Sequence, residues 1–188
     1  MGTVDSVIIC NSPVKKEKKK RMKKIDIILG DITYPKSESL IIPANLSGIM
    51  NRGVQKRIVK EGWKIIEKEA KENVKKGNLE LGDYFVTEPG RLKRRGVKKI
   101  YHSIIKRFPS DFTSVNIVNK ALLNVFRGVI KDKNSSVTIC SIGTEPGELD
   151  KTIIAKIMIR ICEKFKSEIK IKIMDEDEEF INDIRKYL

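Results

Sequence analysis

Three short segments rich in glycine, asparagine and aspartate have the composition of a site for a phosphate or a sugar. They span residues 30–33, 43–53 and 143–148, and each follows a run of apolar residues. Glycine lets backbone N–H groups approach an anion closely, while asparagine and aspartate side chains hydrogen-bond to hydroxyl and amino groups. Loops that follow parallel strands meet at one edge of a sheet, where ligands of α/β proteins bind. The three segments therefore predict one shared ligand site.

The third segment lies within SIGTEPGELD, residues 141–150, and its charge conflicts with its pattern. An apolar run, a glycine loop and a helix in succession are typical of phosphate binding. Glu145 and Glu148, however, would repel a phosphate if their carboxylates faced it, and Pro146 removes one N–H donor. The segment is either a phosphate loop or an ordinary turn, and the direction of two carboxylates decides between them.

Other catalytic and metal-binding patterns are missing from the sequence. It contains no GxxxxGK[ST] motif and no GxGxxG after a strand. Cys10, Cys140 and Cys162 form no CxxC pair, so we expect no disulfide framework, no metal site and no cofactor, in a reducing cytoplasm. The single histidine, His102, lies in an apolar run and is expected to be a packed strand residue. Cys140 is expected to be a buried thiol rather than a nucleophile.

The net charge of +14 is concentrated in two segments. Residues 15–24 contribute +7 and residues 91–99 contribute +6, and the rest of the chain is nearly balanced. Such runs are usually solvated, and the alternative is a site for nucleic-acid phosphates, RNA in particular. The residues of that alternative are Lys18, Lys19, Lys20, Arg21, Arg91, Arg94 and Arg95. No aromatic residue interrupts either run, so base stacking is not expected there.

The hydrophobic pattern predicts alternating strands and helices. Predicted strands span residues 25–29, 40–42, 84–87, 99–105, 137–141 and 169–174. Predicted helices span 53–75 with a break near 62, and begin after 113 or 114, after 150, and within 175–179. Alternation of this kind predicts an α/β fold, a three-layer α/β/α sandwich whose mixed, mostly parallel six-stranded sheet has helices on both faces.

The sequence divides into an arm and a domain. Residues 1–24 combine a short apolar piece with the lysine run, and we expect a basic, disordered arm. Residues 25–188 are long enough for one domain with its own core. No apolar run approaches the ~20 residues of a membrane span, so no membrane partner is expected. The abundance of lysine, isoleucine and glutamate favours a thermophilic source.

Six short motifs follow one another from residue 25 to the C-terminus. They are GDIT at 30–33, IPAN at 42–45, GV at 53–54, GDYFVT at 82–87, IYH at 100–102, and SIGT at 141–144 with Gly147. Each motif is weak alone. In this order, with matching elements between them, they resemble the macrodomain family. Members of that family bind ADP-ribose and related nucleotides, and some hydrolyse ADP-ribose derivatives.

The resemblance implies a role for each matching residue. Asp31 would accept a hydrogen bond from the adenine amino group, while the N–H of Ile32 would donate to the ring. Met174 would pack on adenine, and Asn45 would bind the distal ribose and, as the one predicted catalytic residue, place the reacting water. Backbone N–H groups of the two glycine segments would bind the diphosphate. The complete predicted ligand set is Asp31, Ile32, Asn45, Arg52, Gly53, Val54, Gly143, Thr144, Glu145, Gly147 and Met174.

Departures from the family pattern identify a divergent member. Asn51 and Arg52 replace two glycines, although Arg52 has the geometry to pair with a phosphate. Gln55 replaces an acid of hydrolytic members and is no base, and Glu145 and Glu148 replace glycines. The resemblance thus favours binding of ADP-ribose or a related adenine nucleotide. Hydrolysis of ADP-ribose-1''-phosphate, O-acetyl-ADP-ribose or an ADP-ribosylated protein is the less supported expectation.

Overall fold

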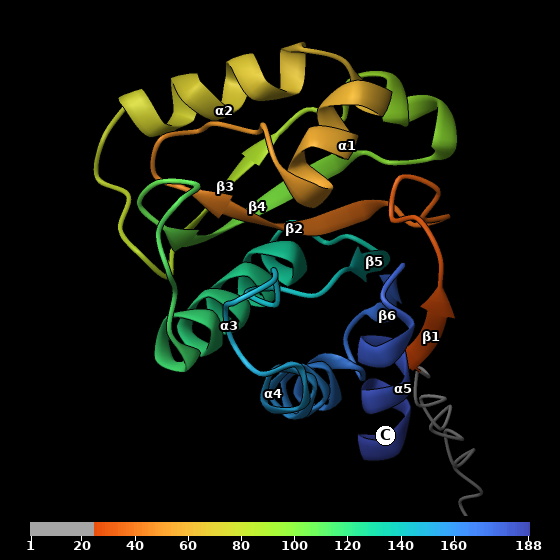
Figure 1. Cartoon of the computed structure of the whole chain (residues 1–188). Coiled ribbons are helices and arrows are strands. Elements are labelled where there is room, and N and C mark those ends of the chain that lie inside the picture. The colour runs from red at the N-terminus through yellow and green to blue at the C-terminus, as the bar shows by residue number, and fades with distance from the viewer. Residues whose placement is uncertain (1–24) are drawn as a thin grey trace, which may run out of the picture.

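Six strands form one sheet between two layers of helices in the computed structural model, which describes residues 25–188 (Figure 1). The strands are β1 (Ile25–Leu29), β2 (Ser39–Asn45), β3 (Tyr84–Thr87), β4 (Lys99–Lys106), β5 (Ser136–Ile139) and β6 (Lys170–Asp175). The helices are α1 (Gly53–Gly62), α2 (Ile65–Lys75), the 3₁₀ helix η1 (Gly90–Arg95), α3 (Val115–Lys131), α4 (Lys151–Phe165) and α5 (Glu178–Tyr187). The predicted fold class is confirmed.

The strand order is β1-β6-β5-β2-β4-β3. Every neighbouring pair is parallel except β3 and β4, which form an antiparallel pair at one edge. Five strands therefore end at the same edge of the sheet. The loops that leave those five carboxyl ends converge there, which is the geometry that the glycine-rich segments require.

The two faces of the sheet are covered by different helices. In β2, Leu40 and Ile42 pack with Ile58 of α1 and Ile66 of α2, while Ile41 joins the larger core beneath α3, α4 and α5. This alternation follows from the two-residue period of a strand. Figure 1 shows α1 and α2 on one side of the sheet and α3 and α4 on the other.

Two element boundaries bear on the site. The predicted break in the first long helix is confirmed, because α1 ends at Gly62 and α2 begins at Ile65. The predicted end of the second strand at residue 42 is wrong, since β2 continues through Pro43 to Asn45. Beyond Ile41, β2 pairs only with β4. A strand with one neighbour tolerates a proline, which lacks the N–H that a second neighbour would need.

The helix caps follow their sequence signals. Ser114 and Asp150 accept hydrogen bonds from the backbone of α3 and α4, as predicted. The last helix begins within the predicted residues 175–179, because β6 ends at Asp175 and α5 starts at Glu178. Asp177 caps α5, and its Oδ1 accepts a hydrogen bond from the N–H of Phe180 at 3.2 Å. Within residues 25–188, no helix has the length and hydropathy to cross a bilayer.

His102 is a packed residue of β4, as its apolar surroundings predict. Its side chain is completely buried, Nε2 lies 2.8 Å from Oγ1 of Thr87, and the ring stacks on Phe85 at a centroid distance of 4.5 Å. Burial lowers the pKa of His102 from 6.5 to about 3. The imidazole is therefore neutral and serves the core rather than the ligand site.

The buried histidine makes stability depend on pH. Unfolded His102 binds a proton near pH 6.5 and the folded residue only near about pH 3, so stability is lost as the pH falls through this window. We expect a loss of about 1–3 kcal/mol by about pH 4 from this group. His102→Gln keeps a partner for Thr87 and does not titrate, so its free energy of unfolding should fall less steeply. Urea unfolding between about pH 7 and pH 4 measures the difference, and parallel curves would contradict the prediction.

Candidate functional site

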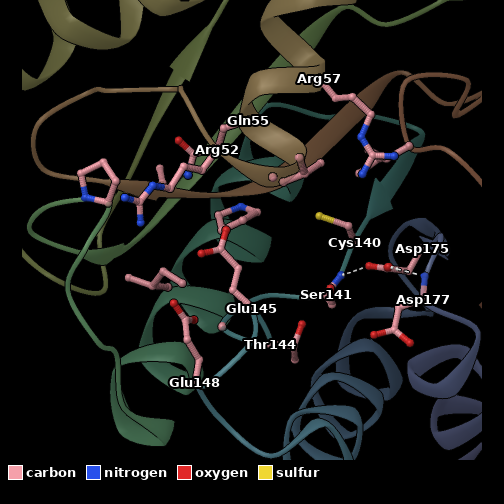
Figure 2. Close-up of a pocket in the computed structure, with 18 of the residues that line it drawn as sticks. Arg52, Gln55, Arg57, Cys140, Ser141, Thr144, Glu145, Glu148, Asp175 and Asp177 are labelled. Carbon is pink, nitrogen blue, oxygen red and sulfur yellow. Dashed lines mark hydrogen bonds between the residues drawn. The ribbon is translucent and has the colours of Figure 1, made fainter.

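A cleft of about 290 Å³ opens at the carboxyl edge of the sheet (Figure 2). All three predicted segments line it: Gly30 and Ile32 come from the first, Asn45 from the second, and Gly143 and Thr144 from the third. The convergence expected from the topology is therefore present. A cleft of this size at this edge suits part or all of a small ligand.

The N-terminus of α1 forms one wall of the cleft. Arg52 precedes the helix in an extended conformation, and among the described residues no side chain caps the first turn. The N–H groups at this end have no intrahelical partner, and the helix dipole adds positive potential. Gly53, Val54 and Gln55 line the cleft here. This wall therefore offers backbone donors to an anion.

The loop after β5 forms the opposite wall. Gly143 has φ +79°, and a Cβ at this position would lie 3.1 Å from Cγ2 of Thr113 and 3.2 Å from Cγ2 of Val118. The loop closes on itself because the N–H of Leu149 donates to the carbonyl of Gly143 at 3.1 Å. Only glycine fits both the backbone angle and the space. Gly147, predicted to bind a diphosphate, is exposed and does not line the cleft.

Lys106 is the charged residue of the cleft floor. It ends β4, where the register with β2 shifts so that Asn45 faces Lys106. Its side chain is only 8% exposed, and its Nζ pairs with Glu148 and, at 3.3 Å, with Oε2 of Glu145. The carboxylates of Glu145 and Glu148 therefore both point toward Lys106. They are tolerated because a buried ammonium group lies between them.

Glu145 lies where the two walls approach each other. A Cβ added to Gly53 would lie 3.0 Å from Oε1 of Glu145, so this carboxylate reaches the N-terminal end of α1. Figure 2 shows Glu145 in the cleft, pointing from the loop of Thr144 toward the wall of Arg52 and Gln55. A carboxylate between a helix N-terminus and a lysine occupies the position that favours a ligand anion. The protein thus fills its anion site with its own side chain.

Asn45 is held by its own loop. Its Oδ1 accepts hydrogen bonds from the N–H and Oγ of Ser47 and from the N–H of Ile49, and its Nδ2 donates to the carbonyl of Ile49. The side chain is nearly inaccessible, at 3% exposure, although the residue lines the cleft. Its Oδ1 is therefore committed to bracing the loop. The predicted catalytic role of Asn45 stays a prediction.

The opposite end of the cleft carries the residues expected around adenine. Ile32 and Met174 are buried and line it. Asp31 does not line it, and its Oδ1 accepts a hydrogen bond from the N–H of Thr33 at 2.8 Å. Asp175 lines this end instead, and its Oδ2 accepts from the N–H of Ser141 at 2.9 Å (Figure 2). Asp31 thus stabilises its turn beside the cleft wall.

Several residues of the cleft lie outside the predicted ligand set, among them Lys106, Pro109, Arg57 and Asp175. Asp175 directly follows an apolar strand pattern, and this position indicates that it lies at the carboxyl edge of the sheet. Lys106 ends the apolar run KIYHSIIK and is indistinguishable by pattern from a solvated strand end. Arg57 pairs with Glu176 across the cleft, and no local pattern indicates that contact.

Cys140 lies at the floor of the cleft and is buried, as expected. Burial raises the pKa of its thiol well above the ordinary value, so it is not a thiolate nucleophile. Among residues 25–188, no group of histidine, cysteine, aspartate or glutamate side chains has the arrangement of a metal site.

The basic segment after β3 lies apart from the cleft. It forms the 3₁₀ helix η1, which carries Arg91, Arg94 and Arg95. None of the three lines the cleft. Arg95 is committed to internal contacts, donating to the carbonyl of Thr33 at 3.0 Å and to Glu61 at 2.7 Å. Lys18, Lys19, Lys20 and Arg21 lie outside the described residues.

Comparisons by sequence identify a family and relatives. A family model described as Macro domain matches residues 41–158. A protein of Aquifex aeolicus (strain VF5) is 30% identical over 166 residues, which cover 87% of this chain and 97% of the relative. One from Sulfurisphaera tokodaii is 30% identical over 141 residues, covering 74% and 75%. Both relatives are described as uncharacterized.

Comparisons by structure identify the same fold at lower identity. The macrodomain of Mycobacterium tuberculosis DarG superposes with a TM-score of 0.73 at 19% identity, covering 81% of this chain and 97% of that one. An Oceanobacillus iheyensis macrodomain mutant with ADPR gives 0.70 at 19% identity, covering 85% and 89%. Thermosipho africanus DarTG in complex with ADP-ribose gives 0.69 at 21% identity, covering 79% and 40%.

The ion pair between Lys106 and Glu148 is buried, so breaking it should lower the free energy of unfolding. Lys106→Met leaves the Glu148 carboxylate without its partner, and we expect the free energy of unfolding to fall by about 3 kcal/mol. Lys106→Met combined with Glu148→Met removes both charges and should restore most of the loss. Urea unfolding of the three proteins measures this coupling. Equal stability of the single variant and the unsubstituted protein would show that the pair is not buried in solution.

Proposed function

The chain belongs to the macrodomain family, and from that premise we propose that its cleft binds ADP-ribose or a closely related adenine nucleotide. The observation that carries the proposal is the anion site between the uncapped N-terminus of α1 and the Gly143 loop, with Lys106 at its floor. Relatives of the same fold support it, because their descriptions name ADPR, ADP and ADP-ribose as bound molecules.

The lining supports a proposed place in the cleft for each part of the ligand. The diphosphate fits between Gly53 and Val54 on one side and Gly143 and Thr144 on the other, where backbone donors face it. Adenine fits at the apolar end of the cleft, where Met174 supplies an adaptable thioether surface. The distal ribose then lies toward the end that contains Lys106.

Binding requires an exchange of anions. Glu145 occupies the position between α1 and Lys106, and its side chain is 45% exposed. Glu148 is only 7% exposed and pairs with the same lysine. Glu145 therefore leaves more easily than Glu148, and a ligand phosphate takes its place beside Lys106. The exchange keeps the ammonium group paired, which makes a loop with two carboxylates compatible with an anionic ligand.

Calorimetry with Glu145→Gln tests the proposal. The protein should bind ADP-ribose more tightly than ADP or AMP, and Glu145→Gln should bind ADP-ribose about 5- to 10-fold more tightly because it removes a competing charge. Glu178→Gln, an exposed residue of α5, is the matched control and should change nothing. Absence of binding of all three nucleotides at millimolar concentration would refute the binding site. Weaker binding by Glu145→Gln would refute the exchange alone.

A second function, hydrolysis of the bond that joins a leaving group to the distal ribose, is favoured by the state of Glu148. Its Oε2 is buried and has no hydrogen-bond partner among residues 25–188, while Oε1 pairs with Lys106. A buried carboxylate beside an ammonium group has the components of an acid–base pair. We propose that Glu148 takes a proton from water and that Lys106 gives one to the leaving group, producing ADP-ribose and the protonated leaving group.

Hydrolysis is tested with ADP-ribose-1''-phosphate, O-acetyl-ADP-ribose and ADP-ribosylated protein as substrates. Glu148→Gln and Lys106→Met should each lower kcat at least about 100-fold, with ADP-ribose affinity measured in parallel. Asn45→Ala is the comparison variant. Loss of turnover in Asn45→Ala alone would show that Asn45 is the catalytic residue and that Glu148 and Lys106 are not. Absence of turnover with every substrate would refute hydrolysis and leave the binding proposal intact.

A further inference from the structure

Trp63 has an unusual backbone conformation, and its indole ring is exposed to solvent. It is the single tryptophan of the sequence, and its φ of +85° and ψ of 157° lie in a region that is essentially reserved for glycine. The side chain is nevertheless 52% exposed, so burial of the ring does not offset the strain. This aromatic residue is held in a strained conformation and is exposed to solvent. Both features together indicate a binding surface.

Close packing of α1 against η1 explains where the strain arises. Gly62 ends α1, and a side chain at Gly90 would collide with the Gly62 carbonyl. The two glycines therefore bring the helix end and η1 together. The chain must then turn at Trp63, whose N–H donates to the carbonyl of Val59 at 2.9 Å. Glycine is the usual residue at such a turn, yet this protein has tryptophan there.

Cationic side chains surround the ring. The guanidinium carbon of Arg91 lies 3.9 Å from the centroid of the Trp63 ring. A 3₁₀ helix has three residues per turn, so Arg94 lies directly above Arg91 on the same face of η1. Lys64 and Lys93 are exposed beside them. These residues, together with Arg91 and Arg94, form a strongly positive surface around one aromatic ring, which we term the Trp63 surface.

A second aromatic residue lies next to this surface. Tyr34 is 57% exposed, and the guanidinium carbon of Arg95 lies 3.9 Å from its ring centroid. The bonds that Arg95 makes to Thr33 and Glu61 fix the Tyr34 loop beside η1. The sequence places no aromatic residue within the basic run, but the fold brings Tyr34 and Trp63 to it. An aromatic residue that is distant in the sequence can therefore serve this basic run, and the absence of base stacking stays an untested prediction.

We propose that the Trp63 surface binds single-stranded nucleic acid, a function separate from that of the cleft. An exposed base stacks on the Trp63 ring, and the neighbouring phosphates pair with Arg91 and Arg94. A duplex hides its base faces, so it matches this surface less well. A membrane requires a wider apolar area than one ring surrounded by charges provides. An acidic peptide would use the charges but leave the ring without a partner.

The single tryptophan makes binding at this surface directly observable. The full chain is titrated with 12-residue oligouridine and oligothymidine, which contain no adenine and so avoid the cleft. Both should quench Trp63 fluorescence, and saturating ADP-ribose should not prevent it. Labelled oligonucleotide anisotropy measures the affinity of the variants. Quenching by RNA alone or DNA alone identifies the preferred strand and supports the proposal in either case.

Variants separate stacking from charge and from folding. Trp63→Gly relieves the backbone strain, so its melting temperature should not fall, while oligonucleotide affinity should fall at least about 5-fold. Trp63→Phe keeps a ring and should stay within about 2-fold. Arg91→Gln with Arg94→Gln should reduce the slope of log affinity against log salt by about 1.4. Arg185→Gln, exposed on α5, controls for the loss of a charge elsewhere.

Three results would overturn the proposal. The first is an anisotropy increase without quenching of Trp63, which would place the oligonucleotide elsewhere on the chain, for example on residues 1–24. The second is unchanged affinity in Trp63→Gly. The third is quenching by vesicles of anionic phospholipid or by polyglutamate with none by either oligonucleotide, which would assign the surface to a membrane or an acidic protein.

Discussion

The pairing of Lys106 with Glu145 and Glu148 sets the character of the ligand site. An ammonium group that is 8% exposed requires a counter-charge, and two carboxylates of the β5–α4 loop supply it. Their attraction draws the loop toward the floor of the cleft and toward the N-terminus of α1. The shape of the cleft, its internal charge balance and the fate of any anion that enters it therefore depend on one buried cation.

The fold explains why this cation lies where it does. β4 is paired on both sides, with β2 and β3, as far as Ser103, and its end at Lys106 pairs with β2 at the edge where five strands finish. The register shift opposite Asn45 brings Lys106 level with the loop that Asn45 braces. A lysine on a flexible loop would stay hydrated and pair weakly. A lysine at the end of a paired strand has already lost most of its water, which supports the proposed selective exchange of its partner anion.

Much of the architecture could be predicted from local patterns. The two-residue and 3.6-residue periods located the elements, and capping residues such as Ser114 and Asp150 located helix starts, because these signals act between neighbours in the chain. The direction of Glu145 and Glu148 could not be predicted, since it depends on Lys106, about 40 residues earlier in the sequence. The exposed ring of Trp63 beside η1 depends equally on a contact between Gly62 and Gly90 that no local pattern indicates.

The distribution of charge separates the two surfaces by the ligands that they attract. Lys106 is neutralised by its own loop, so the cleft adds little to the long-range field and selects a ligand through contacts made after entry. At η1, Arg91 and Arg94 are exposed to solvent, and the Arg91 guanidinium group lies over the ring of Trp63. A polyanion gains from many such charges and releases many counterions, whereas a single diphosphate gains little. On the two proposals, the same basic protein draws a polymer to one surface and admits a small nucleotide at the other.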